Sequence, residues 1–251
     1  MTPDLSSPWV WGVAVAGALC VGMAKTGFGG LGIVAVSLFA QLLPARQSTG
    51  ALLPLMIFAD LFAVFFYRRH ADWSDLRRLL PATFAGIVAG WWIMPLIPDR
   101  QFTLLLGWLI LGLMALTVLQ RRYAGALSIA AQHPVIGLSA GVATGMATML
   151  ANAAGAITSF YFLARCMDKL TFVGTAAWFY LIVNLSKVPF SAQLGLIDIE
   201  SLSFDLMLLP VVATGCLAGR LLLHRVSQRT FEWVTITLAT AAAIRLILAS
   251  R

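Results

Sequence analysis

Apolar runs of about 20 residues recur along the whole of this chain, and no other feature constrains its fold as strongly. A helix of that length crosses the hydrocarbon core of a bilayer, which is about 30 Å thick. Only 11% of the residues are charged, whereas a soluble domain has about 25%. Because the runs leave no room for a soluble domain, we predict an all-α, polytopic membrane protein.

The charge of the chain indicates topology rather than nucleic-acid binding. Its formal net charge is +7, but the basic residues form short clusters between the apolar runs, as the loops of membrane proteins do. The cysteines lie far apart and the histidines fall in loops or at segment ends, so neither a disulfide framework nor a metal site is expected. No cofactor and no nucleic-acid partner are expected either. The residues concerned are Cys20, Cys166, Cys216, His70, His133 and His224.

The apolar runs form two series with the same order of parts. Each series has one overlong run of about 30 to 35 residues, more than one membrane crossing needs, followed by three runs of ordinary length. This parallel suggests an internal repeat. The expected runs lie at about 9–43, 47–67, 79–97 and 102–120, and then at about 133–163, 170–190, 203–224 and 229–249.

Two sequence matches support a duplication. The segment LLPATFAGIVAG (79–90) aligns without a gap to LLPVVATGCLAG (208–219), with identity at six of twelve positions. Within the overlong runs, GMAKTGFGGLG (22–32) pairs with GMATMLANAAG (145–155). Because the two matches occur in the same order, we predict two homologous halves.

The distribution of lysine and arginine favours an inverted repeat. If each overlong run crossed the membrane once, the basic residues of the loops and tail would divide eight against seven, which favours neither orientation. If each run is broken and returns, or crosses twice, eleven share one face and four the other. The positive-inside rule then makes the basic loops cytoplasmic and the C-terminus periplasmic.

In that topology each half, residues 1–125 or 126–251, has one broken or re-entrant segment and three transmembrane helices. The halves would begin and end on opposite faces of a single membrane domain, which is a recurring architecture of secondary transporters. Charge alone leaves open whether the first overlong run is re-entrant or crosses twice.

Glycines interrupt the first overlong run and predict an anion site. Non-helical backbone is tolerated at membrane depth only inside protein or beside a watery cavity. A break there starts a new half-helix, whose free N–H groups and positive dipole end favour an anion. The alternative is that the glycines only permit close helix packing. The candidate ligands near the two breaks are Lys25, Thr26, Gly27, Gly29, Gly30, Thr148 and Asn152.

Four polar residues within the predicted helices have alternative roles. Lys25 is costly at membrane depth, so we expect it to face the anion, with snorkelling or pairing with a carboxylate as alternatives. Asp60 could pair with Lys25, carry a coupling proton or bond to neighbouring backbone. Asn184 could contact the substrate or form an interhelical hydrogen bond. Lys187 precedes Pro189 near the predicted outer end, so we expect it to snorkel.

Two motifs of the aligned segments are expected to be structural. Pro81 and Pro210 are predicted to open their helices, where a missing N–H costs little. Glycines at four-residue spacing predict faces for close helix packing. These glycines are Gly86, Gly90, Gly215 and Gly219.

The chain resembles the TauE/SafE sulfite exporter family, also called the four-toluenesulfonate uptake permease family. The resemblance rests on the size, the two halves, GMAKTGFGGLGIVAVSLFAQLLP and the following ARQSTGALLPLMIFADLFAVFFYRRHADW. It implies a bacterial inner-membrane carrier of sulfite, sulfoacetate or another organosulfonate. The family's usual pattern has three consecutive glycines after a G-x, which Leu31 interrupts here, and Lys25 replaces a small residue.

We therefore expect a secondary carrier, not an enzyme, that moves a small sulfur-containing anion by alternating access. The anion would bind at the broken-helix N-termini, with the lipid bilayer as the other partner. One alternative is an intramembrane hydrolase of lipid phosphates, although the sequence has no G-x-S-x-G and no buried cluster of carboxylates and histidines. The other alternative is a passive anion channel. The anion, the direction, any coupling ion and the oligomeric state, including a homo-oligomer, stay open.

Overall fold

The computed structural model describes residues 7–27, 30–122, 134–165, 167–222 and 228–249, and in these ranges it contains helices and no strands. Short 3₁₀ turns, η1 (Arg68–His70) and η2 (Met94–Leu96), follow α3 and α4. The α-helices are α1 (Pro8–Thr26), α2 (Leu31–Phe39), α3 (Ala45–Tyr67), α4 (Trp73–Ile93), α5 (Asp99–Arg122), α7 (Pro134–Ala151), α8 (Gly155–Ala164), α9 (Lys169–Gln193), α10 (Ile199–Leu222) and α11 (Gln228–Ala249).

Six helical stretches of the described residues are long and apolar enough to cross a membrane. They correspond to α1, α3, α4, α5, α9 and α10. This result confirms the predicted all-α, multi-pass membrane protein. The two overlong runs are each divided, into α1 and α2 and into α7 and α8.

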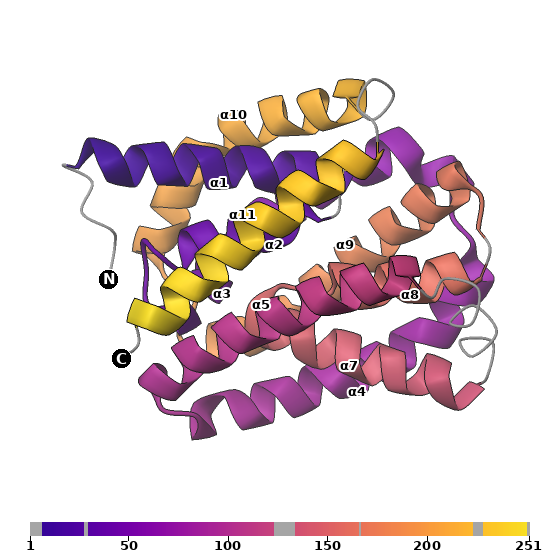
Figure 1. Ribbon diagram of the computed structural model, residues 1–251, viewed down its shortest axis with the longest axis horizontal. Coiled ribbons are helices and arrows are strands. Elements are labelled where there is room, and N and C mark those ends of the chain that lie inside the picture. The colour runs from indigo at the N-terminus through magenta and orange to yellow at the C-terminus, as the bar shows by residue number, and fades with distance from the viewer. Residues whose placement is uncertain (1–6, 28–29, 123–133, 166, 223–227, 250–251) are drawn as a thin grey trace.

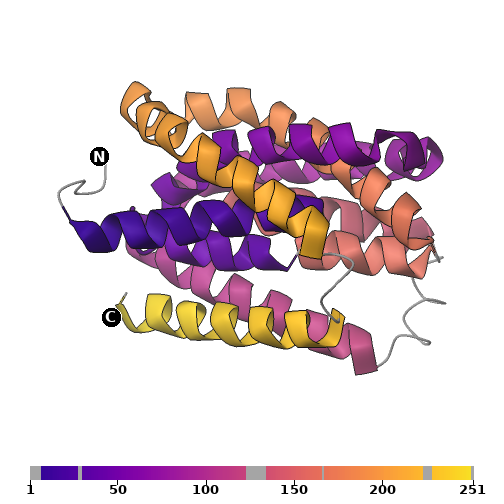
Figure 2. The same cartoon turned by 90° about the horizontal axis from the view of Figure 1, so that it is seen from above.

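The helices lie roughly along one common axis (Figures 1 and 2). We call the end of the bundle with η1 the Arg68 end, and the end where α5 begins the Asp99 end. Helix α3 runs toward the Arg68 end and α9 runs back beside it, since Gly174 lies against Tyr67 and Gly50 lies against Leu196. These two helices form the centre of the bundle, and each carries a buried charged residue, Asp60 on α3 and Lys187 on α9.

Glycine contacts join α1 to α10 and α4 to α7, and the helices of each pair run in the same direction. Gly22 packs on the backbone of Gly215, and Gly145 packs on the backbone of Gly86. A Cβ atom at any of these four positions would clash with the facing main chain. The predicted role of the glycine motifs in close helix packing is therefore confirmed.

The first divided run forms a helical hairpin. Ala24 of α1 lies opposite Gly32 of α2, and Gly17 lies opposite Phe39, so α2 returns along α1. The 9 residues of α2 span about 13.5 Å at 1.5 Å per residue, less than half of a hydrocarbon core of about 30 Å. Both outer ends of this hairpin lie toward the Asp99 end, where α3 begins.

The second divided run also turns back on itself. Asn152 follows α7 with φ = 51°, a left-handed conformation that asparagine tolerates better than most residues. Gly137 of α7 faces Tyr161 of α8, so the two helices are antiparallel. An ion pair between Arg165 and Asp75 of α4 holds the end of α8 at the Arg68 end. The two hairpins therefore open toward opposite ends of the bundle.

Helices α4 and α10 begin earlier than the sequence indicated. The prediction that Pro81 and Pro210 open their helices is wrong, because both prolines lie inside them. The start of α4 is set by Asp72, whose carboxylate accepts hydrogen bonds from the N–H groups of Ser74 and Asp75. Polar residues in the first turns of α4 delayed the apolar pattern, so the prediction placed the start too late.

Candidate anion site between two broken helices

A small cavity lies between the starts of α2 and α8. Its volume is about 40 Å³, whereas a single water needs about 10–15 Å³ on the same measure. The cavity therefore has room for a few waters or one small oxyanion. Its polar side chains are Lys25, Thr148, Asn152, Tyr180 and Asn184.

Main chain from both half-helices reaches this cavity. Gly32 and Ile33 line it from the first turn of α2, and Ala154 and Gly155 line it from the start of α8. The first N–H groups of a helix have no partner within the helix and carry its positive dipole end. The small residues at both starts leave this backbone close to the space that an anion would occupy.

Lys25 and Asp60 form a buried ion pair beside the cavity. Lys25 Nζ, in the last turn of α1, lies 2.9 Å from Asp60 Oδ1 of α3, and the two side chains are 11% and 1% exposed. The same Nζ lies 4.4 Å from the ring centroid of Tyr180, a cation–π distance. Lys25 therefore pairs with a carboxylate, which is one of the roles that the sequence allowed for it.

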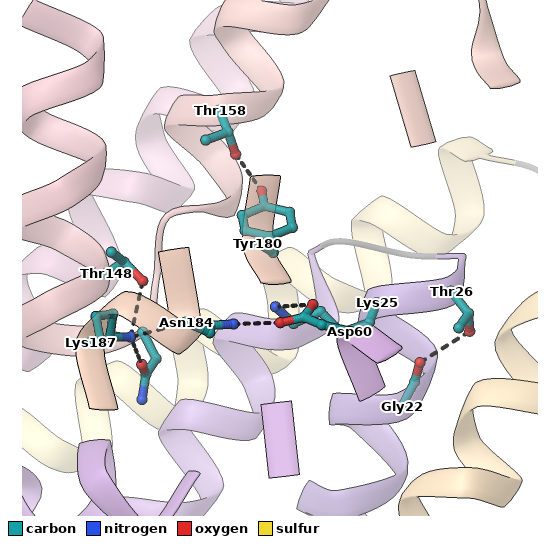
Figure 3. A network of polar contacts seen from close by, with 10 residues as sticks. Gly22, Lys25, Thr26, Asp60, Thr148, Thr158, Tyr180, Asn184 and Lys187 are labelled. Atoms are coloured by element: carbon teal, nitrogen blue, oxygen red, sulfur yellow. Dashed lines mark hydrogen bonds and ion pairs between the residues drawn. The ribbon is translucent and has the colours of Figure 1, made fainter. Parts of the chain in front are cut away.

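A chain of hydrogen bonds continues from Asp60 to a second lysine (Figure 3). Asn184 Nδ2 donates to Asp60 Oδ2 over 2.6 Å. Lys187, one helical turn further along α9, donates to Asn184 Oδ1 over 3.4 Å, to Thr148 Oγ1 over 3.2 Å and to Asn152 Oδ1. Two lysines and one carboxylate are thus joined through amide and hydroxyl groups.

The Asn152 side chain connects this network to α3. Its amide Nδ2 donates to the Thr49 carbonyl oxygen over 2.7 Å, while its Oδ1 accepts from Lys187. Both ends of the amide are used, which fixes its orientation. The residue that interrupts the second overlong run therefore also positions Lys187.

Tyr180 holds α8 against α9. Its phenol oxygen and the hydroxyl of Thr158, in the first turn of α8, form a hydrogen bond. The Tyr180 ring also lies over the Lys25 ammonium, as Figure 3 shows. Tyr180 thus joins the start of the second half-helix to the lysine at the end of α1.

Comparison with protein-family models decides the family of this chain. The model described as sulfite exporter TauE/SafE matches residues 14–246. The chain belongs to the TauE/SafE sulfite exporter family. This membership confirms the resemblance and supports anion transport across a membrane as the general function. In the same comparisons, no curated protein and no solved structure matched the chain.

The other predicted ligands that the structure describes, Thr26, Gly27 and Gly30, do not line the cavity. The Thr26 hydroxyl donates to the carbonyl oxygen of Cys216 over 2.7 Å. The Gly27 N–H donates to Met23 O over 3.1 Å. Gly30 caps the start of α2, and Gly29 lies outside the described residues.

The sequence pattern did not indicate two residues of the network, Lys187 and Tyr180. The prediction that Lys187 snorkels is wrong, because its side chain is 1% exposed. Pro189 suggested a helix end, but α9 continues to Gln193. The spacing of three residues between Asn184 and Lys187 places both on one helix face. This spacing was the feature of the sequence that could have indicated that Lys187 joins Asn184 in the site.

Proposed function

We propose that this protein is a secondary carrier that moves a small sulfur-containing anion, such as sulfite or an organosulfonate, across the bacterial inner membrane. The observation that carries this proposal is the cavity between the N-terminal ends of α2 and α8, beside Lys25. Fixed N–H dipoles and buried lysines stabilise an anion at that place. Membership of the sulfite exporter family supports the same substrate class.

Alternating access would follow from an inverted repeat of residues 1–125 and 126–251. The two hairpins, α1–α2 and α7–α8, open toward opposite ends of the bundle. In such a repeat, α1 of the first half corresponds to α7 of the second, and α4 corresponds to α10. Helix α1 packs on α10, and α7 packs on α4. This exchange of equivalent pairs is the pattern expected for halves related by a two-fold axis in the membrane plane.

Both ends of the bundle carry an ion pair that would have to open in turn. Arg165 Nε lies 2.9 Å from Asp75 Oδ1 at the Arg68 end. Arg46 lies 3.1 Å from Asp99 Oδ1 at the Asp99 end, and it also donates to the Ile97 carbonyl oxygen. In the proposed cycle, the anion reaches the cavity from one end while the pair at the other end stays closed. The Arg68 end, which is rich in arginine, would face the cytoplasm.

Export of an anion would be favoured by the membrane potential. Moving one charge across 100 mV is worth about 2.3 kcal/mol, and the negative interior drives anions outward. Facilitated export would therefore need no ATP. Any coupling proton would be carried by Asp60, the buried carboxylate of the network.

Efflux from proteoliposomes loaded with sulfite tests the proposal. We expect Lys25→Ala to lower the rate at least about tenfold, because an anion would lose about 1.4 kcal/mol or more of stabilisation. Arg69→Ala, which removes a cation from the exposed η1 turn, is the matched control and should keep the wild-type rate. Normal efflux from Lys25→Ala would contradict the proposed site, and unitary currents in planar bilayers would assign a channel instead.

A further inference from the structure

The buried charges beside the cavity do not balance. Lys25 and Asp60 neutralise one another at 2.9 Å. Lys187 lies within hydrogen-bond distance of three oxygens, on Thr148, Asn152 and Asn184, a set that matches the three N–H donors of its ammonium form. Each acceptor is a hydroxyl or amide oxygen, so none of them supplies a negative charge.

No carboxylate in the described part of the chain pairs with Lys187. Asp60 is joined to it only through Asn184, and both Asp60 oxygens already face Lys25 or Asn184. Lys187 itself does not line the cavity. It lies behind Thr148, Asn152 and Asn184, three side chains that do line it.

The site therefore carries one unmatched positive charge, on a lysine that is 1% exposed. A buried charge without a partner is costly. An anion in the cavity would face the dipoles of two helix starts. The Lys187 ammonium would lie close to it, behind the side chains that line the cavity. One negative charge on that anion cancels the excess, whereas a second would be left unmatched.

We infer that the site is matched to a monovalent anion, such as bisulfite or an alkyl sulfonate, and discriminates against dianions such as sulfate. This inference rests on the proposed function and narrows its substrate class by charge. Asp60 determines the net charge of the site, because its carboxylate neutralises the Lys25 ammonium. An Asp60 that is neutral would leave two cations unmatched and turn the preference toward a dianion.

Binding measured by calorimetry on the purified, full-length protein in nanodiscs tests the inference. The probes are methanesulfonate as the monoanion, sulfate as the dianion and dimethyl sulfone as an uncharged analogue of similar size. For the wild-type protein we expect methanesulfonate to bind at least about tenfold more tightly than either other probe, which is the effect of one unmatched charge.

Two variants separate the charge count from a general loss of structure. Asp60→Asn should shift the ratio of sulfate to methanesulfonate affinity toward sulfate by at least about tenfold. Lys187→Met should remove the advantage of methanesulfonate over dimethyl sulfone. Asp198→Asn, a change to another good helix-cap residue in the exposed turn before α10, is the matched control and should leave all ratios unchanged.

The possible results distinguish the inference from the function on which it rests. Equal binding of sulfate and methanesulfonate by the wild-type protein, or an unchanged ratio in Asp60→Asn, would overturn the charge rule and leave an anion carrier. Binding of neither anion would overturn both the rule and the proposed site.

Discussion

Lys25 of α1 is held 2.9 Å from Asp60 of α3, and this ion pair connects the tip of the first hairpin to the central helix of the bundle. Asn184 extends the connection to α9, and Lys187 extends it to the tip of the second hairpin. The two helix breaks are thus joined through one buried polar network. In a carrier, a movement of one hairpin would displace the hydrogen-bonded side chains that contact the other hairpin.

The first prediction concerns the stability of this ion pair. Lys25→Met leaves the Asp60 carboxylate buried without its cation, so it should destabilise the protein by about 3–5 kcal/mol. The double variant Lys25→Met/Asp60→Leu removes both charges and should recover most of that loss. Thermal unfolding in detergent measures both effects. A single variant as stable as the wild-type protein would show that Asp60 does not depend on Lys25.

The same double variant separates folding from transport. Because it lacks the cation that lines the cavity, it should stay folded but lose sulfite efflux at least about tenfold. Wild-type efflux from this variant would mean that Lys25 does not contact the transported anion.

The second prediction concerns the break after α7. Asn152 has φ = 51°, so Asn152→Gly should keep the backbone, while Asn152→Ala should be less stable by about 1–3 kcal/mol. Both variants lose the bond to Lys187 and should slow efflux equally. Melting temperatures and efflux rates are the measurements. Equal melting temperatures for the two variants would contradict a strained turn at this residue.

The third prediction concerns the packing of α4 on α7. A Cβ atom at Gly145 would clash with the carbonyl oxygen of Thr83, so Gly145→Ala should destabilise the protein by about 1–3 kcal/mol. The matched control is Gly112 on α5, which has nothing within 4 Å of an added Cβ. Gly112→Ala should stabilise by about 0.5–1 kcal/mol, because alanine is the better helix former. A Gly145→Ala protein that melts no lower than Gly112→Ala would contradict the packing.

The fourth prediction concerns a carboxylate outside the network. Asp205 of α10 is 2% exposed, and neither of its oxygens has a hydrogen-bond partner among the described residues. An unsatisfied buried polar group costs about 1–3 kcal/mol, so Asp205→Leu should raise the melting temperature in detergent. A lower melting temperature would show that the carboxylate has a stabilising partner in the folded protein.

The sequence predicts most of the spans and the two interruptions because both depend on local composition. Long apolar runs must be helices in lipid, and a glycine-rich stretch or an asparagine at a matching place weakens the helix. The structure accordingly ends α1 at Thr26 and α7 at Ala151. The starts of α4 and α10 were placed too late, because polar first turns hide a helix from an apolar pattern.

The network itself depends on which helices become neighbours, and this is not a local property. Asp60 and Asn184 are 124 positions apart in the chain, and their hydrogen bond requires α3 and α9 to lie side by side at that level. Lys187 resembled a snorkelling lysine because Pro189 suggested a helix end. The tertiary fold brings α9 near the end of α7, and this proximity places the Lys187 side chain beside Thr148 and Asn152.

An anion should bind between the starts of α2 and α8. A crystal structure of the protein soaked with selenite, a heavier analogue of sulfite, tests this binding when data are collected at the selenium absorption edge. We expect an anomalous peak in the cavity between Gly32 and Gly155, within reach of Lys25. A peak only elsewhere on the protein, with this cavity empty at saturating selenite, would contradict it.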